Sequence, residues 1–137
     1  MRSSKLQVKT PVDGSVYAEV PLHSYAEVEQ AFARARTAQR AWRETTIAER
    51  AKICSAAVDA FVADGEEIAK ELSWQMGRPV SQTPGEVRGF AERARYMIEI
   101  APKALGDIDA GPKENFKRYV HREPLGVVFT VAAWNYP

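Results

Sequence analysis

Four consecutive residues with side chains suited to chemistry stand at the end of the chain: Trp134, Asn135, Tyr136 and Pro137. They directly follow an apolar run, and in an open α/β sheet ligands collect at the carboxyl ends of the strands. The Asn135 carboxamide is suited to donate an N–H to an oxyanion that develops during a reaction. Together with Pro137 it is equally suited to turn the chain, so the residue types alone leave both interpretations open.

Cys54 is the only cysteine of the chain, and a cysteine thiolate is a strong nucleophile at neutral pH. It falls on the apolar stripe of a predicted helix with no histidine near it in sequence, so we expect a buried, structural residue. A single cysteine makes no internal disulfide, and His23 and His121 lie too far from it for a zinc-site spacing. Neither a G-x-G-x-x-G motif after a strand nor a Walker sequence is present, and no metal site is expected.

The composition is that of one ordinary soluble domain, with 137 residues of which 45% are apolar and 27% charged. Nineteen basic and eighteen acidic residues alternate along the chain, so no basic stripe is available to bind nucleic acid. No window approaches the roughly 18 apolar residues that a membrane span needs, and the first residues lack the apolar core of a secretory leader. We therefore expect a cytoplasmic protein without a membrane or nucleic-acid partner.

Turn and capping signals predict a hairpin and about four helices. The dipeptide Asp13-Gly14 favours a tight turn between two short strands within residues 6–22. Capping boxes at Ser24–Glu27 and Thr46–Glu49 each predict the start of a helix. The predicted helices span residues 24–42, 46–64, 66–76 and 83–102, the last ending at Pro102.

Apolar residues recur at helical spacing on the first two predicted helices. The stripe of the first helix consists of Val28, Ala31, Phe32, Ala35, Ala38 and Trp42. The predicted buried face of the second helix consists of Ile47, Ala51, Cys54, Val58, Phe61 and Val62.

The character of the sequence changes after residue 112, where two strand patterns follow each other. Residues 116–122 alternate between polar and apolar positions, whereas residues 125–133 are apolar on both faces, as in an inner parallel strand. Such a strand requires neighbours on each side, which the chain does not supply. We expect an α/β fold of which this chain is a fragment or one piece of a larger assembly.

The combination of Glu123–Val128 with Trp134–Pro137 closely resembles the segment by which aldehyde dehydrogenases enter their dinucleotide-binding domain. The resemblance covers nearly the whole chain. Weaker matches occur in the family's order at Pro11–Gly14, at Trp42 with Ala48–Ala51, at Gly77–Pro79 and at Gly85–Val87.

The resemblance implies the N-terminal portion of an NAD- or NADP-dependent oxidoreductase with an aldehyde dehydrogenase-like fold. Residues 1–115 would form the hairpin and helical part of the cofactor-binding domain, residues 116–124 an oligomerisation strand, and residues 125–137 the incomplete first strand of the Rossmann-like core. The complete protein would be a homodimer or homotetramer. It would oxidise a small aldehyde to a carboxylic acid through a cysteine thiohemiacetal and thioester. The nucleophile would lie beyond Pro137, so this chain alone is predicted to be inactive.

The resemblance also implies roles for individual residues at the end of the chain. Asn135 would stabilise the thiohemiacetal oxyanion and is the predicted catalytic residue. Tyr136 would line the aldehyde tunnel. The residues that would form part of the cofactor wall are Val131, Ala132, Ala133 and Trp134. Ala133 departs from the family pattern, because many members carry proline there.

A helical interaction module is the alternative prediction from another class of protein. Four amphipathic helices within residues 24–105 could form a bundle without any catalysis. That prediction leaves the apolar run and the polar residues that follow it unexplained.

Overall fold

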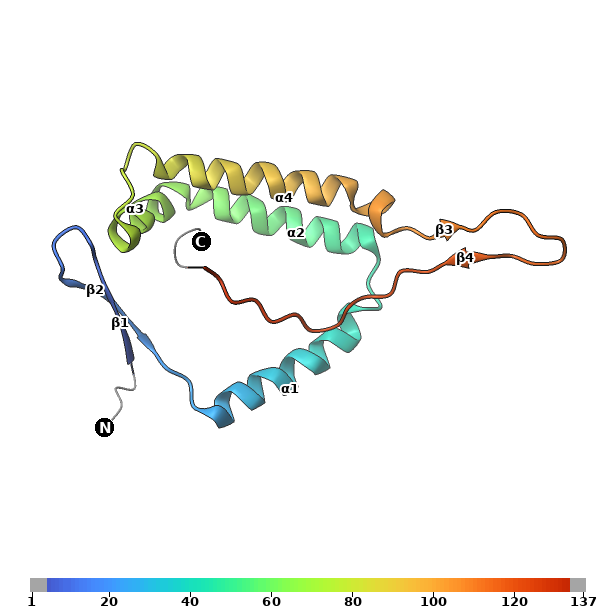
Figure 1. The fold of residues 1–137 in the computed structure, drawn as a ribbon, viewed down its shortest axis with the longest axis horizontal. Helices are drawn as coiled ribbons and strands as arrows, with labels where there is room; N and C mark the ends of the chain where they lie inside the picture. The colour runs from blue at the N-terminus through green and yellow to red at the C-terminus, as the bar shows by residue number, and fades with distance from the viewer. Residues whose placement is uncertain (1–4, 134–137) are drawn as a thin grey trace.

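The structure is a computed structural model, and it describes residues 5–133. The elements in chain order are β1 (Lys5–Lys9), β2 (Val16–Pro21), α1 (Tyr25–Trp42), α2 (Ile47–Ala63), α3 (Gly65–Met76), α4 (Thr83–Leu105), β3 (Ile108–Asp109) and β4 (Tyr119–Val120). Figure 1 shows α2 and α4 as a long antiparallel pair with α3 at one end, while α1 stands apart and the β3–β4 hairpin projects from the opposite end. The arrangement is extended, with a small core.

The predicted N-terminal hairpin is confirmed. β1 and β2 pair in antiparallel fashion, with Val8 opposite Ala18 and an irregularity in the register after Val8. At the turn, the Asp13 carboxylate accepts a hydrogen bond from the Ser15 backbone N–H at 2.9 Å, which lowers the pKa of Asp13 below its usual value. Gly14 has a φ of 78°, a conformation that glycine adopts without steric cost.

Both predicted capping boxes are confirmed. The Ser24 and Thr46 side chains accept hydrogen bonds from the backbone N–H of the glutamate three residues later. Glu27 and Glu49 each accept a hydrogen bond from the backbone N–H of the capping residue, at 2.7 Å in both cases. Because these bonds favour the ionised carboxylate, the pKa values of both glutamates lie below normal. The two helices therefore begin where the sequence predicted.

The core lies where α2, α3 and α4 meet. Val58 of α2, Ala69 of α3 and Val87 of α4 are buried. The rings of Phe61 and Phe90 pack beside them with centroids 4.3 Å apart. These contacts hold the three helices together, because apolar surface removed from water stabilises at about 25 cal/mol per Å².

Thr83, at the start of α4, is fully buried and connects α4 to α3 through its hydroxyl. Its Oγ1 donates to the Val80 carbonyl at 3.2 Å and lies 3.3 Å from the Ser73 hydroxyl. The buried hydroxyl is therefore satisfied, as a polar group in a core must be.

The N-terminal hairpin docks on α3 through one aromatic pair. The Tyr17 ring lies parallel to the Trp74 ring with centroids 5.8 Å apart, and its hydroxyl donates to the Glu71 carboxylate at 2.7 Å. That hydrogen bond raises the pKa of Tyr17 and lowers the pKa of Glu71. Gly77 ends α3 in the left-handed conformation, and a Cβ there would lie 2.8 Å from the Pro11 side chain.

The predicted end of the fourth helix at Pro102 is wrong, because α4 continues to Leu105. A proline in the last turn removes a single N–H and already has a helical φ, so one further turn is tolerated. The helix ends before Gly106, whose backbone is extended.

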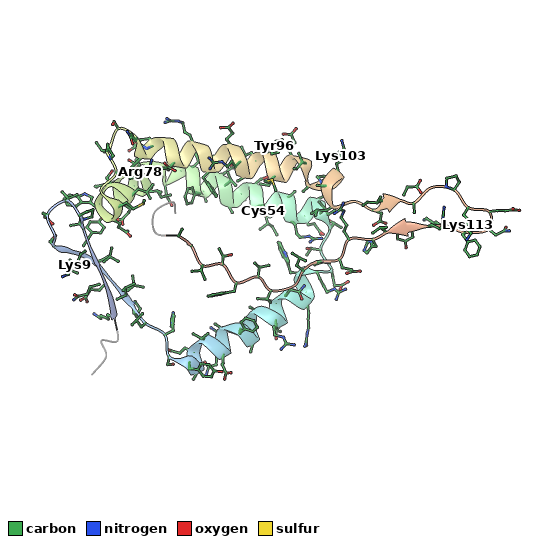
Figure 2. The ribbon with its side chains drawn as sticks, viewed as in Figure 1. Lys9, Cys54, Arg78, Tyr96, Lys103 and Lys113 are labelled. Atoms are coloured by element: carbon green, nitrogen blue, oxygen red, sulfur yellow. The ribbon has the colours of Figure 1, made fainter. Side chains whose placement is uncertain are left out.

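The predicted burial of the second helix's apolar face is also wrong for Cys54, which is exposed. Figure 2 labels this residue on α2. Of the six residues on that predicted face, only Val58 is buried. Helical periodicity identifies an apolar face, but burial requires a partner surface. Within residues 5–133, α4 covers only part of the face.

The four helices do not form the bundle of the alternative prediction. α1 contains no buried residue, and the core is built from α2, α3 and α4 alone. Among the described helices, none combines the length and apolarity that crossing a bilayer would require.

Replacing Gly77 by alanine is expected to destabilise the fold by about 1–2 kcal/mol, the usual cost of a left-handed conformation for an L-residue. The contact with Pro11 adds to that cost. Urea unfolding followed by circular dichroism measures the change.

The matched control is Gly89→Ala in α4, where a Cβ meets only the far end of the Arg93 side chain at 3.9 Å. This change is expected to stabilise by roughly 0.5–1 kcal/mol, because alanine favours the helix. Equal effects at the two glycines would refute the proposed constraint at Gly77.

Candidate functional site

The predicted cofactor wall lies on an extended segment, residues 121–133, that follows β4. Val131, Ala132 and Ala133 are exposed, and the Val131 side chain is 80% accessible. Trp134, Asn135 and Tyr136, which carry the predicted cofactor, catalytic and substrate roles, lie outside the described residues. The predicted geometry of these three side chains thus stays a prediction.

The apolar run at residues 125–133 forms no strand within the described part of the chain. Backbone pairing requires a neighbouring strand, and none lies beside it among residues 5–133. Figure 1 shows the segment running between α1 and the α2–α4 pair. Its apolar side chains are largely exposed, with Phe129 at 81%.

The apolar stripe predicted on the first helix faces this segment. Val28, Phe32 and Ala35 of α1 line a cavity of about 610 Å³ together with Val127 and Phe129. The same groove continues along α1, where Ala38 and Trp42 lie near Gly126 and Val127. Two features that are far apart in the sequence therefore come together as a helix beside an extended apolar segment.

The side chains of this segment can line a binding site, but they offer almost no group that could take part in catalysis. Residues 125–133 contain one hydroxyl, Thr130, and no acid, base or thiol. Such a segment can present backbone groups and small side chains to a ligand, and it can position residues that follow it. Within residues 5–133, no three His, Cys, Asp or Glu side chains gather in a way that could hold a metal ion.

A projecting hairpin, here called the arm, comprises β3, β4 and the loop 110–118 (Figure 1). Ile108 pairs with Val120, and Asp109 pairs with Tyr119. The strand predicted at residues 116–124 is therefore shorter in the structure, and it pairs with a partner that the sequence did not reveal. β3 is only two residues long, too short for an alternating pattern to identify.

One arginine organises the loop of the arm. The Nη2 atom of Arg118 donates to the carbonyl oxygens of Ala110, Gly111 and Pro112, each at 3.2 Å. The Asp109 carboxylate accepts from the Gly111 backbone N–H at 2.8 Å. The loop thus has a defined shape, and Figure 2 shows Lys113 near its tip.

The surface of the arm combines exposed apolar side chains with lysines. Phe116, Tyr119 and Val120 are all more than half exposed. Lys113 lies over the Phe116 ring at 5.0 Å, and Lys117 lies over the Tyr119 ring at 5.7 Å. An arm with apolar side chains and open strand edges is a surface on which another strand can pair.

The family model that matches the chain is that of the aldehyde dehydrogenase family, over residues 1–137. The chain belongs to the aldehyde dehydrogenase family. This finding confirms the resemblance noted in the sequence, and with it the aldehyde dehydrogenase-like fold class.

Individual relatives agree with this assignment. An NADP-dependent glyceraldehyde-3-phosphate dehydrogenase from Streptococcus equinus is 31% identical over 100% of this chain and 30% of its own length. The crystal structure of a putative aldehyde dehydrogenase from Burkholderia cenocepacia has a TM-score of 0.88 and 31% identity, covering 97% of this chain and 27% of that one. A structure of PnpE in complex with nicotinamide adenine dinucleotide has a TM-score of 0.80 and 29% identity, covering 88% of this chain and 25% of that one. The chain spans 25–30% of the length of the curated relatives it matches.

Replacing Arg118 by methionine is expected to loosen the loop of the arm, because methionine keeps much of the length but donates no hydrogen bond to the three carbonyls. Amide hydrogen exchange of residues 110–118, measured by mass spectrometry, is expected to become faster. Arg122→Met removes the same charge just beyond β4 and is the control. Equal exchange in the two variants would contradict the role of Arg118.

Proposed function

We propose that this chain is the N-terminal part of an NAD- or NADP-dependent enzyme that oxidises a small aldehyde to a carboxylic acid. The observation that supports this most strongly is the family match over the whole chain, together with Trp134–Pro137 directly after the extended apolar segment. Residues 1–115 belong to the cofactor-binding domain, residues 116–124 to the oligomerisation strand, and residues 125–137 to the first strand of the dinucleotide-binding core. The expected cytoplasmic location rests on the sequence alone.

In this proposal the chain contributes oxyanion stabilisation. A thiolate supplied from outside these 137 residues attacks the aldehyde carbon, and the negative charge passes to the carbonyl oxygen. The Asn135 side-chain N–H donates to that oxygen, where a fixed donor stabilises the transition state more than the ground state. Cys54 does not supply the thiolate, because it lies in the middle of α2 with no histidine near it in sequence.

A nicotinamide cofactor, when bound, would supply the acceptor for the hydride of the aldehyde carbon. Part of the wall that would hold the cofactor, largely through backbone groups, is assigned to Val131, Ala132, Ala133 and Trp134. The small alanine side chains favour this role, because they permit close approach of a ligand to the backbone. A glutamate outside the chain then activates water, which hydrolyses the thioester and releases the acid.

Both cofactor types occur among the relatives, since one is named as NADP-dependent and another is solved with nicotinamide adenine dinucleotide. The choice between them depends on contacts to the 2′ position of the adenosine ribose. We therefore propose NAD or NADP as the cofactor.

The arm is proposed to pair with a partner subunit in a homodimer or homotetramer. Its strands are short, its outer edges are unpaired within residues 5–133, and its apolar side chains are exposed. Adding a strand from another chain would satisfy those edges and cover that surface.

Replacing Asn135 by alanine in the complete enzyme is expected to lower kcat by about 10²–10³-fold, the usual effect of removing one oxyanion donor. Formation of NADH or NADPH from an aldehyde, followed at 340 nm, measures the rate. An unchanged kcat would exclude the oxyanion role.

The control for this substitution is Asn115→Gly in the loop of the arm. Asn115 is the other asparagine of the chain and has a φ of 62°, which glycine tolerates. Its replacement is expected to leave kcat unchanged. The 137 residues produced alone are expected to form no NADH or NADPH from an aldehyde. Aldehyde-dependent formation of either product by that chain would overturn the proposal that the nucleophile lies outside it.

Replacing Val120 by glutamate is expected to shift the protein toward smaller assemblies, because a carboxylate would have to lose its hydration in a strand interface. Sedimentation velocity measures the shift. Lys113→Glu places a carboxylate near the tip of the same arm (Figure 2) and is expected to have a smaller effect. An unchanged sedimentation coefficient for Val120→Glu would refute the interface.

A further inference from the structure

A charged cluster that none of the proposed catalytic roles uses lies at the base of the arm. His121 directly follows β4. Its Nδ1 atom lies 2.5 Å from the carboxylate of Asp107, a residue in the link between α4 and β3. Its Nε2 atom lies 3.6 Å from the Glu123 carboxylate. Glu123 in turn accepts a hydrogen bond at 3.3 Å from the guanidinium of Arg43, the residue that directly follows α1. The His121 imidazole therefore links Asp107, next to the end of α4, to Glu123, which contacts Arg43 next to the end of α1.

The number of protons on the imidazole decides how many of these contacts are favourable. A neutral imidazole has one N–H, so it can donate to Asp107 or to Glu123 but not to both. Its other nitrogen is then a lone pair facing a carboxylate, which is unfavourable. The imidazolium has two N–H groups, one on each side of the ring, and both carboxylates are then paired with a donor.

We propose that His121 is a pH-sensitive clamp at the base of the arm, which as an imidazolium joins Asp107 to Glu123 and as a neutral ring releases one of them. The clamp connects the segment leaving the arm to the end of α4 and, through Glu123 and Arg43, to α1. Its release frees the arm to change its angle relative to the helices. This inference concerns the arm's attachment and does not depend on the catalytic proposal.

The charged groups around His121 come from each element that surrounds it. Asp107 and Glu123 are the carboxylates in contact with the ring, and Arg43 and Glu44 form an ion pair at the end of α1. The Tyr119 ring meets the imidazole edge-on, with ring centroids 6.4 Å apart. The Lys117 ammonium lies over that same Tyr119 ring, 5.7 Å from its centroid. Arg50 and Arg122 line the same groove as His121.

The balance of these charges favours the imidazolium. The hydrogen bond to Asp107 is the largest cause of a pKa of His121 above its usual value, and the charges of Asp107 and Glu123 act in the same direction. Because the folded-state pKa is raised, the clamp is complete at pH values below the ordinary histidine pKa near 6.5. It is lost as the pH rises through the higher value in the folded protein.

The test uses hydrogen exchange on the complete protein, measured by mass spectrometry across the pH range 5 to 9. Exchange at the imidazole C2 position reports the protonation of His121, and the peptide containing His23 serves as an internal reference. Amide exchange of residues 107–121, corrected for the intrinsic effect of pH, reports the attachment of the arm. The variants are His121→Gln, Asp107→Asn and, as a control that removes an acidic charge from the same arm, Glu114→Gln.

In the wild type, amide protection at the base of the arm is expected to fall as His121 loses its proton. Asp107→Asn is expected to lower the pKa of His121, whereas Glu114→Gln is expected to leave that pKa unchanged. His121→Gln is expected to lose the pH dependence of protection while keeping the circular dichroism spectrum of the wild type. Protection that is independent of pH in the wild type, or unaffected in its pH dependence by His121→Gln, would overturn the clamp.

Discussion

The packing of α2 against α4 is the interaction on which the rest of the structure depends. It buries Val58 and Val87, brings Phe61 onto Phe90, and gives α3 a surface to cover with Ala69. Once α3 is held, its exposed side offers Trp74 and Glu71 to Tyr17, so the N-terminal hairpin has a place to dock. The turn that contains Pro11 also approaches Gly77 closely, so the position of the hairpin depends on the end of α3 as well.

A different constraint governs the extended segment. Residues 125–133 have the pattern of a strand that is apolar on both faces, and backbone groups in such a strand need partners on both sides. Within residues 5–133 the elements that line grooves with it are helices, chiefly α1, and a helix offers apolar side chains but no ladder of hydrogen bonds. The segment is therefore extended without being a strand, and the apolar stripe of α1 faces it without becoming buried.

In the arm, polar groups rather than apolar packing determine the conformation of the chain. Arg118 gathers three carbonyl oxygens of the loop, and Asp109 fixes the turn at Gly111. At the base, His121 connects carboxylates from two sides of the hairpin. Since apolar burial contributes little in this part of the chain, hydrogen bonds and charges decide how the arm is held.

Local signals in the sequence were sufficient for the N-terminal hairpin, the starts of the first two helices and the membership of the aldehyde dehydrogenase family. Each depends on residues that interact within a few positions, such as Ser24 with Glu27, or on a run of matching residues. The burial of the second helix, the partner of the arm strand and the contact of His121 with Asp107 were decided only by the tertiary structure. They depend on which surfaces meet, and residues separated by a loop leave no periodic signal of that meeting. The sequence by itself therefore determined where the first hairpin and the first two helices begin and which helix faces are apolar. The fold decided which of those faces are covered, because burial is a property of two surfaces in contact.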